Sequence, residues 1–63
     1  MIFEVEYNDC SITTYATLEE ARAGILDANA NGVTPDSIGE LDDKGNVVRI
    51  YGCTWDVTLE ELP

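Results

Sequence analysis

The sequence contains no histidine and only three basic side chains, Arg22, Lys44 and Arg49, against thirteen aspartates and glutamates. Its formal net charge is therefore −10 at pH 7. A chain this acidic repels phosphate groups, which argues against direct binding to DNA, RNA or anionic lipid. The lack of histidine also removes the side chain most often used for proton transfer near neutral pH.

Cysteine is nearly as scarce, and Cys10 and Cys53 lie far apart in the chain. Without histidine or closely spaced cysteines, the sequence has no zinc-site pattern. A nucleophilic cysteine needs a base or a positive field, whereas the abundant negative charge here raises a thiol's pKa. We expect two reduced thiols in the core, and a disulfide between adjoining strands remains an open alternative.

Long apolar runs and glycine-rich loops are also missing. No stretch approaches the length of a membrane span, and the five glycines are scattered rather than gathered into a phosphate-binding loop. The opening segment carries Glu4 and Glu6 and is unlike a secretory leader. We expect a cytoplasmic protein with no membrane partner, no cofactor and no metal.

The length of the chain suits one small domain, residues 1–63. A chain of 6.9 kDa folds with a surface of roughly 4,000 Å² and buries about 60% of its extended surface. That is enough for one thin core and too little for a deep substrate cavity. We therefore predict that the protein is not an enzyme.

The N-terminal part is predicted to form a β-hairpin. Apolar and acidic residues alternate from Ile2 to Tyr7, and the segment from Cys10 to Tyr15 is rich in β-branched residues. Asn8-Asp9 favours a two-residue turn between them. The predicted cross-strand pairs, all on the core face, are Tyr7 with Cys10, Val5 with Ile12 and Phe3 with Thr14.

A helix is predicted to follow, from Leu18 to about Asn31. Thr17-Leu18-Glu19-Glu20 is a capping box, in which the Thr17 hydroxyl accepts from the Glu20 amide and the Glu20 carboxylate reaches back to the Thr17 amide. Gly32 suits the left-handed position after the helix, and Val33 supplies the accompanying apolar contact. The predicted buried stripe comprises Leu18, Ala21, Ile25 and Ala28, widened by Leu26.

The C-terminal half is predicted to form turns and short strands. These are a turn over residues 34–37, a strand from Ile38 to Leu41, a hairpin loop over residues 42–46 and a strand from Val47 to Tyr51. Val48 and Ile50 are expected to face the core. Residues 53–57 either extend this strand past a bulge at Gly52 or form a separate one, and the tail, residues 58–63, is expected to fray partly.

The predicted fold is therefore α+β, in the order β-β-α-β-β. Whether residues 53–57 add a fifth strand is left undecided. Such a chain forms an antiparallel sheet with its single helix packed on one face. The other face is left to solvent or to a partner.

The loop at residues 42–46 superficially resembles the start of a calcium loop. Counting from Asp42, however, Lys44 stands at the third position and Cys53 at the twelfth, where oxygen ligands are needed. A hairpin turn is the better interpretation.

The excess of carboxylates is the feature that most needs an explanation. Glu4 and Glu6 are two residues apart on a strand, so they project from one face about 6.8 Å apart. The simplest alternative is a solvated acidic surface, and Trp55 is either a core residue or an aromatic anchor. The candidate partner-binding residues are Glu4, Glu6, Asp42, Asp43, Asp56, Glu60, Glu61 and Tyr51.

A compact β-β-α-β-β layout with thirteen carboxylates resembles the small acidic proteins of phages and mobile elements that block host nucleic-acid machinery. Anti-CRISPR proteins and other DNA mimics belong to this type. The resemblance implies a non-catalytic inhibitor that binds a basic surface of a CRISPR effector, or a similar enzyme, and excludes target DNA. For a phage-encoded chain it implies the host cytoplasm.

An alternative function is a small structural or adaptor module, or a homodimer, that docks through an open sheet face or edge. Its binding would depend on apolar side chains such as Ile2 and Trp55 and would respond only mildly to salt. The sequence leaves open whether the protein is a monomer or a homodimer.

Overall fold

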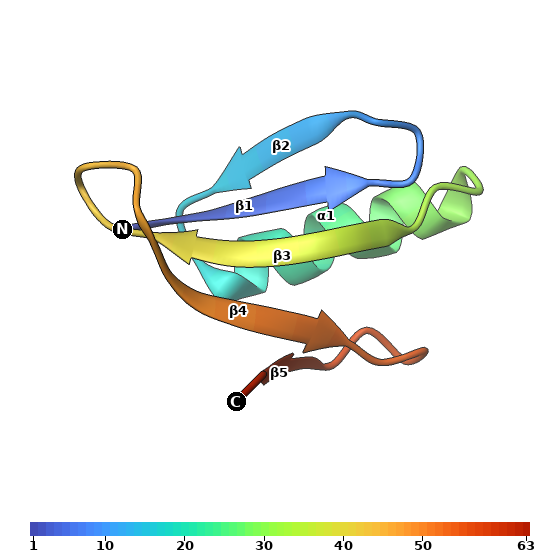
Figure 1. Ribbon diagram of the computed structural model, residues 1–63. Helices are drawn as coiled ribbons and strands as arrows, with labels where there is room; N and C mark the ends of the chain where they lie inside the picture. Colours follow the sequence, from blue (N-terminus) through green and yellow to red (C-terminus); the bar gives the residue numbers. More distant parts are fainter.

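The computed structural model describes all residues, 1–63, and has five strands and one helix (Figure 1). The strands form one sheet in the order β2-β1-β3-β4-β5, and every neighbouring pair is antiparallel. The predicted α+β fold is confirmed. In chain order the elements are β1 (Ile2–Tyr7), β2 (Ile12–Tyr15), α1 (Leu18–Ala30), β3 (Pro35–Leu41), β4 (Val47–Cys53) and β5 (Leu59–Glu61).

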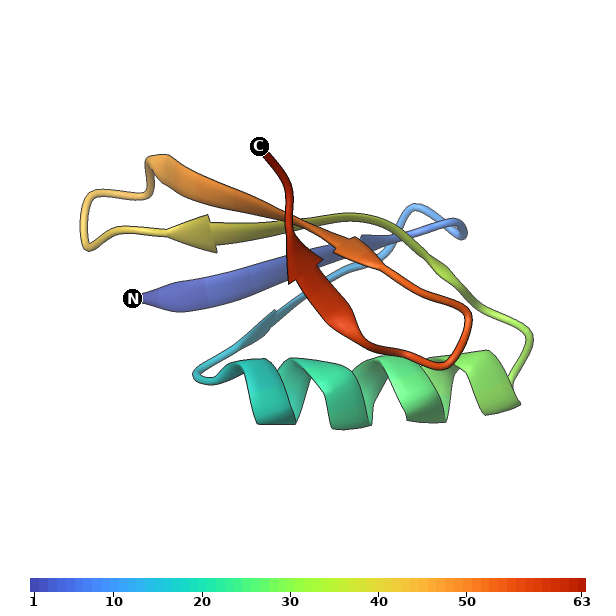
Figure 2. The ribbon, with the colours of Figure 1, turned by 90° about the horizontal axis from the view of Figure 1, so that it is seen from below.

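Helix α1 covers one side of the sheet and leaves the other side bare (Figure 2). It packs closest to β1 and β2, while the turn between β4 and β5 curls toward the helix side (Figure 2). We call the uncovered side of the sheet the open face. Helix α1 is not long and apolar enough to cross a membrane.

The β1–β2 hairpin forms, but its register differs by one residue from the predicted one. Because side chains alternate between faces, this shift moves Ile12 and Thr14 from the predicted core face to the open face. The three predicted pairs are therefore wrong. The observed pairs are Phe3–Tyr15, Glu4–Thr14, Val5–Thr13 and Glu6–Ile12.

The shift arises from one additional residue in the turn. Cys10 adopts a left-handed conformation with φ 69°, and its amide donates to the Tyr7 carbonyl at 3.0 Å. The Tyr7 amide donates in turn to the Ser11 carbonyl at 2.8 Å. A tight turn followed by a left-handed residue makes a three-residue hairpin loop. Cys10, predicted to lie in the core, is exposed in this loop.

Helix α1 begins and ends close to the predicted residues. The Thr17 hydroxyl accepts from the Glu20 amide at 3.1 Å, although the Glu20 carboxylate accepts from the Ala16 amide rather than that of Thr17. At the other end Gly32 has φ 79°. The Gly32 and Val33 amides then donate to the last turn of the helix, as in a Schellman ending.

The predicted buried stripe of α1 is largely correct. Ala21 and Ile25 are fully buried, and Leu18 and Ala28 are partly buried. Leu26, which was expected to widen the stripe, is instead 44% exposed, because it lies toward the solvent side of a helix that packs on the sheet along a narrow contact.

Two predictions for β3 and β4 are wrong. The segment predicted as a turn over residues 34–37 enters the sheet at Pro35, which pairs with Tyr7. Val48 and Ile50 are exposed rather than buried. The register places Ile50 opposite Gly39 on the open face and leaves Val48 unpaired at a bulge. The loop between the strands is as predicted, with Gly45 at φ 83°.

The C-terminal segment is more ordered than expected. β4 runs to Cys53 with no bulge at Gly52, and residues 59–61 pair with it in regular register as β5 instead of fraying. Between them lies a turn over residues 54–58. Val57 from this turn is 3% exposed and joins the core, whereas Trp55 is 96% exposed, so Trp55 is not a core residue.

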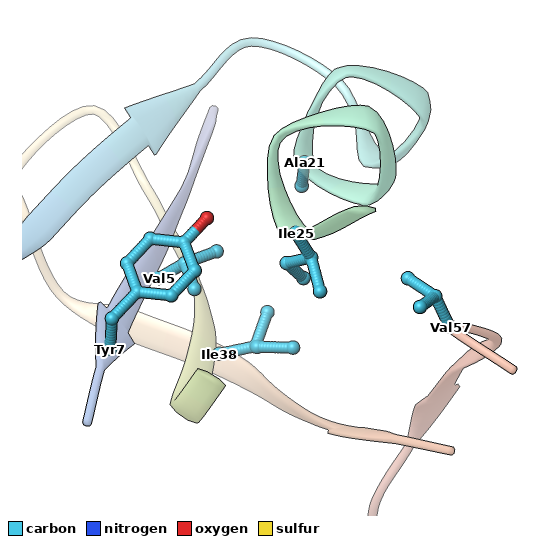
Figure 3. Packing of buried hydrophobic residues seen from close by; sticks show 6 residues of the cluster. All are labelled: Val5, Tyr7, Ala21, Ile25, Ile38 and Val57. Atoms are coloured by element: carbon cyan, nitrogen blue, oxygen red, sulfur yellow. The ribbon is translucent and has the colours of Figure 1, made fainter. Parts of the chain in front are cut away.

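The hydrophobic core lies between α1 and the sheet. Figure 3 shows the side chains of α1 pointing toward those of β1 and β3, with Val57 closing one side. Partly buried apolar residues, including Phe3, Tyr15 and Tyr51, pack around this cluster. The buried core residues are Val5, Tyr7, Ala21, Ile25, Ile38 and Val57.

Candidate partner-binding surface

The open face combines carboxylates with exposed apolar side chains. Residues paired across neighbouring strands share a face, which places Glu4, Glu6 and Glu60 together on this side. The exposed apolar residues there are Ile2, Ile12, Val47, Ile50 and Leu62.

Glu6 and Glu60 lie in one row across the sheet. Glu6 pairs with Ser37 on β3, and Glu60 pairs with Gly52 on β4. Continuing the β3–β4 register by one residue sets Ser37 opposite Gly52, so three strand spacings, about 14 Å, separate the two glutamates. The intervening residues, Ser37 and Gly52, carry no charge, and the Leu62 side chain lies over Gly52.

None of the three basic residues occupies a strand position that faces the open side. Arg22 is on α1, where its Nε donates to the Val57 carbonyl at 2.9 Å. Lys44 is in the β3–β4 loop, and Arg49 is on the helix side of β4, opposite Glu40. The negative charge of the open face is therefore uncompensated by any basic side chain on that face.

A shallow depression on the open face lies over Gly39, which has no side chain to fill it. Glu4 stands on the β1 side of the depression, and Val47 and Ile50 stand on the β4 side. A Cβ added at Gly39 would come no closer than 3.7 Å to Val47 Cγ1. A carboxylate beside apolar walls suits lysine or arginine, whose side chains join an aliphatic stem to a charged head.

Three other predicted acidic residues lie in the β3–β4 loop and the β4–β5 turn, which are at opposite ends of β4 (Figure 1). Asp42, in the β3–β4 loop, accepts from the Asn46 and Lys44 amides at 2.9 Å each, and these bonds lower its pKa. Asp43, in the same loop, lies 3.7 Å from the N-terminal ammonium. Asp56 is in the β4–β5 turn, so the structure does not gather the predicted residues into one patch.

The remaining two predicted residues, Glu61 and Tyr51, lie on the helix side of the sheet. Arg49 contacts Glu61 at 3.2 Å and Glu40 at 3.0 Å, and the Tyr51 hydroxyl donates to Glu40 at 3.1 Å. Glu40 is only 6% exposed. Burial and the bond to Glu40 raise the pKa of Tyr51, while the bond to Glu40 raises that of Arg49. This network joins β3, β4 and β5.

Both thiols are free; Cys10 is exposed and Cys53 is partly buried. Burial, and then the nearby Asp56 carboxylate, raise the pKa of Cys53, which disfavours the reactive thiolate. No group of three or more Cys, Asp or Glu side chains lies close enough together to hold a metal ion.

Sequence reasoning named Ile2 as an apolar docking residue but missed the rest of the apolar part of the open face. It placed Ile12 and Ile50 in the core and did not single out Gly39. One available signal was Gly39 itself, since a glycine within a strand often marks a place where another group approaches the backbone.

Comparison of the chain with protein-family models, with curated proteins and with solved structures finds no match.

Proposed function

We propose that this protein is a non-catalytic inhibitor that binds a basic nucleic-acid-binding surface of a host enzyme. In its most specific form, it is an anti-CRISPR protein that blocks target DNA binding by a CRISPR effector. The observation that carries the proposal is the charge of the open face, which presents Glu4, Glu6 and Glu60 and no basic side chain. We place its action in the cytoplasm, that of the host for a phage-encoded chain.

The chemistry of binding follows from the arrangement of the open face. Arginine and lysine side chains line the channels in which CRISPR effectors hold DNA, and carboxylates accept strong, charge-assisted hydrogen bonds from them. A partner side chain entering the depression over Gly39 would rest its stem on Ile50 and set its charged head beside Glu4. Long-range attraction speeds such an encounter, and occupancy of the channel excludes DNA.

The test is a competition assay in which purified, guide-loaded CRISPR effectors bind labelled target DNA in the presence of the protein. The variant Glu4→Gln/Glu6→Gln removes two charges from the open face. Its matched control, Glu19→Gln/Asp27→Asn, removes two from the exposed surface of α1. We expect the first pair alone to weaken inhibition by about tenfold or more, and rising salt to weaken it further.

Gly39→Ala is a third variant, which changes shape and leaves every charge in place. Its added methyl meets only ordinary contacts, so we expect a folded protein with weaker inhibition. If inhibition withstood both open-face variants, or ignored salt, the electrostatic proposal would be wrong. If none of the CRISPR effectors tested lost DNA binding in the presence of the protein, the anti-CRISPR form of the proposal would be rejected.

The apolar side chains of the open face favour a second candidate, a structural or adaptor module. Val47 and Ile50 are 58% and 54% exposed. Edge strand β2 carries no charged residue, and uncharged edges accept further strands. This function predicts a homodimer or complex that persists at high salt. Sedimentation at low and high salt distinguishes the two, since a salt-resistant dimer supports only the module.

A further inference from the structure

Trp55, the only tryptophan of the chain, projects into solvent from the turn between β4 and β5. It is 96% exposed, more than any other large apolar residue. A tryptophan presents about 150–250 Å² of surface, and small domains have little apolar surface to spare for their cores. A fully solvated tryptophan is therefore unfavourable for this protein in isolation.

The turn that displays Trp55 is held by hydrogen bonds at both ends. The Thr54 amide donates to the Thr58 carbonyl at 3.0 Å, and the Val57 amide donates to the Thr54 carbonyl at 2.9 Å. The Thr54 hydroxyl accepts from the Thr58 amide at 3.0 Å and bonds the Asp56 carboxylate. Trp55 is thus displayed on an ordered turn, which reduces the entropy lost on binding.

Val57 explains why the indole points outward. It has φ 61°, a conformation that is rare for a β-branched residue, and it is buried against α1. The bond from Arg22 Nε to its carbonyl fixes it there at 2.9 Å. Strained backbone of this kind persists where the surroundings hold it, and it is frequent at binding sites. Because the turn places the Val57 side chain in the core, the side chain of Trp55 lies in solvent.

A groove adjoins Trp55, with Pro35 and Cys53 among its walls. Asp56 follows Trp55 directly, and the one basic residue that contacts the turn, Arg22, is engaged with Val57. A surface of this chemistry matches an apolar pocket with basic residues at its rim. Nucleic acid and anionic membranes also bind exposed tryptophan, but the net charge of −10 repels both.

We propose that Trp55 is the anchor of a second docking surface, which inserts into an apolar pocket with a lysine- and arginine-rich rim on a protein partner. The turn lies on the helix side of the sheet (Figure 2), so this surface is separate from the open face. Buried tryptophans are prominent among the residues that dominate interface energies.

The test uses the purified protein with a photo-reactive benzophenone amino acid in place of Trp55, added to a lysate of the cells that naturally make the chain. The matched control carries the same group in place of Leu26, an exposed apolar residue of α1. We expect the variant at position 55 alone to cross-link strongly to one protein, at a site that mass spectrometry maps to an apolar pocket bordered by basic residues.

That protein is then purified and titrated against the unmodified chain. We expect the fluorescence of Trp55 to shift to the blue on binding. Trp55→Ala should weaken the affinity by about tenfold or more, while Leu26→Ala should leave it within about twofold. Circular dichroism checks that both variants fold.

Several results would overturn the inference. These are equal cross-linking at both positions, adducts with nucleic acid, lipid or a second copy of the chain, a mapped site without an apolar pocket, or unchanged affinity of Trp55→Ala. Binding that needs Trp55 but is unaffected by Glu4→Gln/Glu6→Gln would support this second surface, whereas the open-face proposal is decided separately by the competition assay with CRISPR effectors.

Discussion

The ring of Tyr15 fills the space into which a side chain at Gly24 would project. A Cβ built on Gly24 would lie 2.2 Å from the Tyr15 hydroxyl oxygen and 2.5 Å from two of its ring carbons. Tyr15 cannot move away freely, because its hydroxyl is 2.8 Å from that of the buried Tyr7. The absence of a side chain on one helical residue therefore permits β2 and α1 to meet.

This contact predicts that Gly24→Ala destabilises the protein although alanine favours helices. We expect the free energy of unfolding to fall by about 1–3 kcal/mol, because crowding and the lost Tyr7–Tyr15 bond outweigh a propensity gain of about 1 kcal/mol. Urea denaturation followed by circular dichroism measures the change. Gly39→Ala is the control, and it should be neutral or stabilising; equal behaviour of the two variants would contradict the contact.

The left-handed conformation of Cys10 predicts that Cys10→Gly is stabilising. Glycine adopts φ 69° without a steric penalty, so we expect the free energy of unfolding to rise by about 0.5–1 kcal/mol. Cys10→Ala removes the thiol but keeps the Cβ, and it should not reproduce the gain. A gain of equal size from alanine would show that the thiol, rather than the backbone, is unfavourable.

The buried hydroxyl of Tyr7 predicts a loss of stability at alkaline pH. Burial, and then the hydrogen bond with Tyr15, raise the pKa of Tyr7 above its ordinary value of 10.0. Folding thus favours the neutral hydroxyl, so this contribution is complete below pH 10 and is lost as the pH rises toward the pKa of the folded state. We expect the free energy of unfolding to decline above pH 10, and less steeply in Tyr7→Phe. The free energy of unfolding is measured by urea denaturation at a series of pH values. If it fell equally with pH in the two proteins, this assignment would be wrong.

The ion pair between Arg49 and the buried Glu40 predicts a large effect of removing the cation. Arg49→Met leaves the buried Glu40 with only the Tyr51 hydroxyl, and we expect the urea midpoint of unfolding to fall, because a buried carboxylate that loses its cation is unfavourable. Adding Glu40→Gln should recover part of this loss, because a neutral amide is less costly to bury. Lys44→Met removes the same charge from an exposed loop and should change stability by less than about 0.5 kcal/mol in urea denaturation.

Helix α1 was predictable because its signals are local. Thr17 and Glu20 interact within a single turn, and Gly32 ends the helix through its own backbone conformation. The β1–β2 register was not predictable in this way. A two-residue type I′ turn needs positive φ at Asn8 and Asp9, whereas the three-residue turn needs it at Cys10, and cysteine gives no sign of that preference.

The candidate surface was predictable only in part. Alternation along β1 placed Glu4 and Glu6 on one face, and the structure has them there. Glu61 and Tyr51 were assigned to the partner-binding set on charge and aromatic character alone. They lie on the helix side with Arg49 and Glu40, because the pairing of β4 with β5 sets their direction.

Composition and local pattern were sufficient to establish a net charge of −10, a single small α+β domain and the ends of its helix. Tertiary structure was needed to settle that Ile50 faces outward, that Gly39 forms the floor of a depression and that Val57 rather than Trp55 enters the core. The reason is that a one-residue shift in a strand exchanges its two faces. Such shifts depend on turn conformations and on pairing between strands distant in the sequence, whereas charge and helix capping depend only on the residues themselves and their near neighbours.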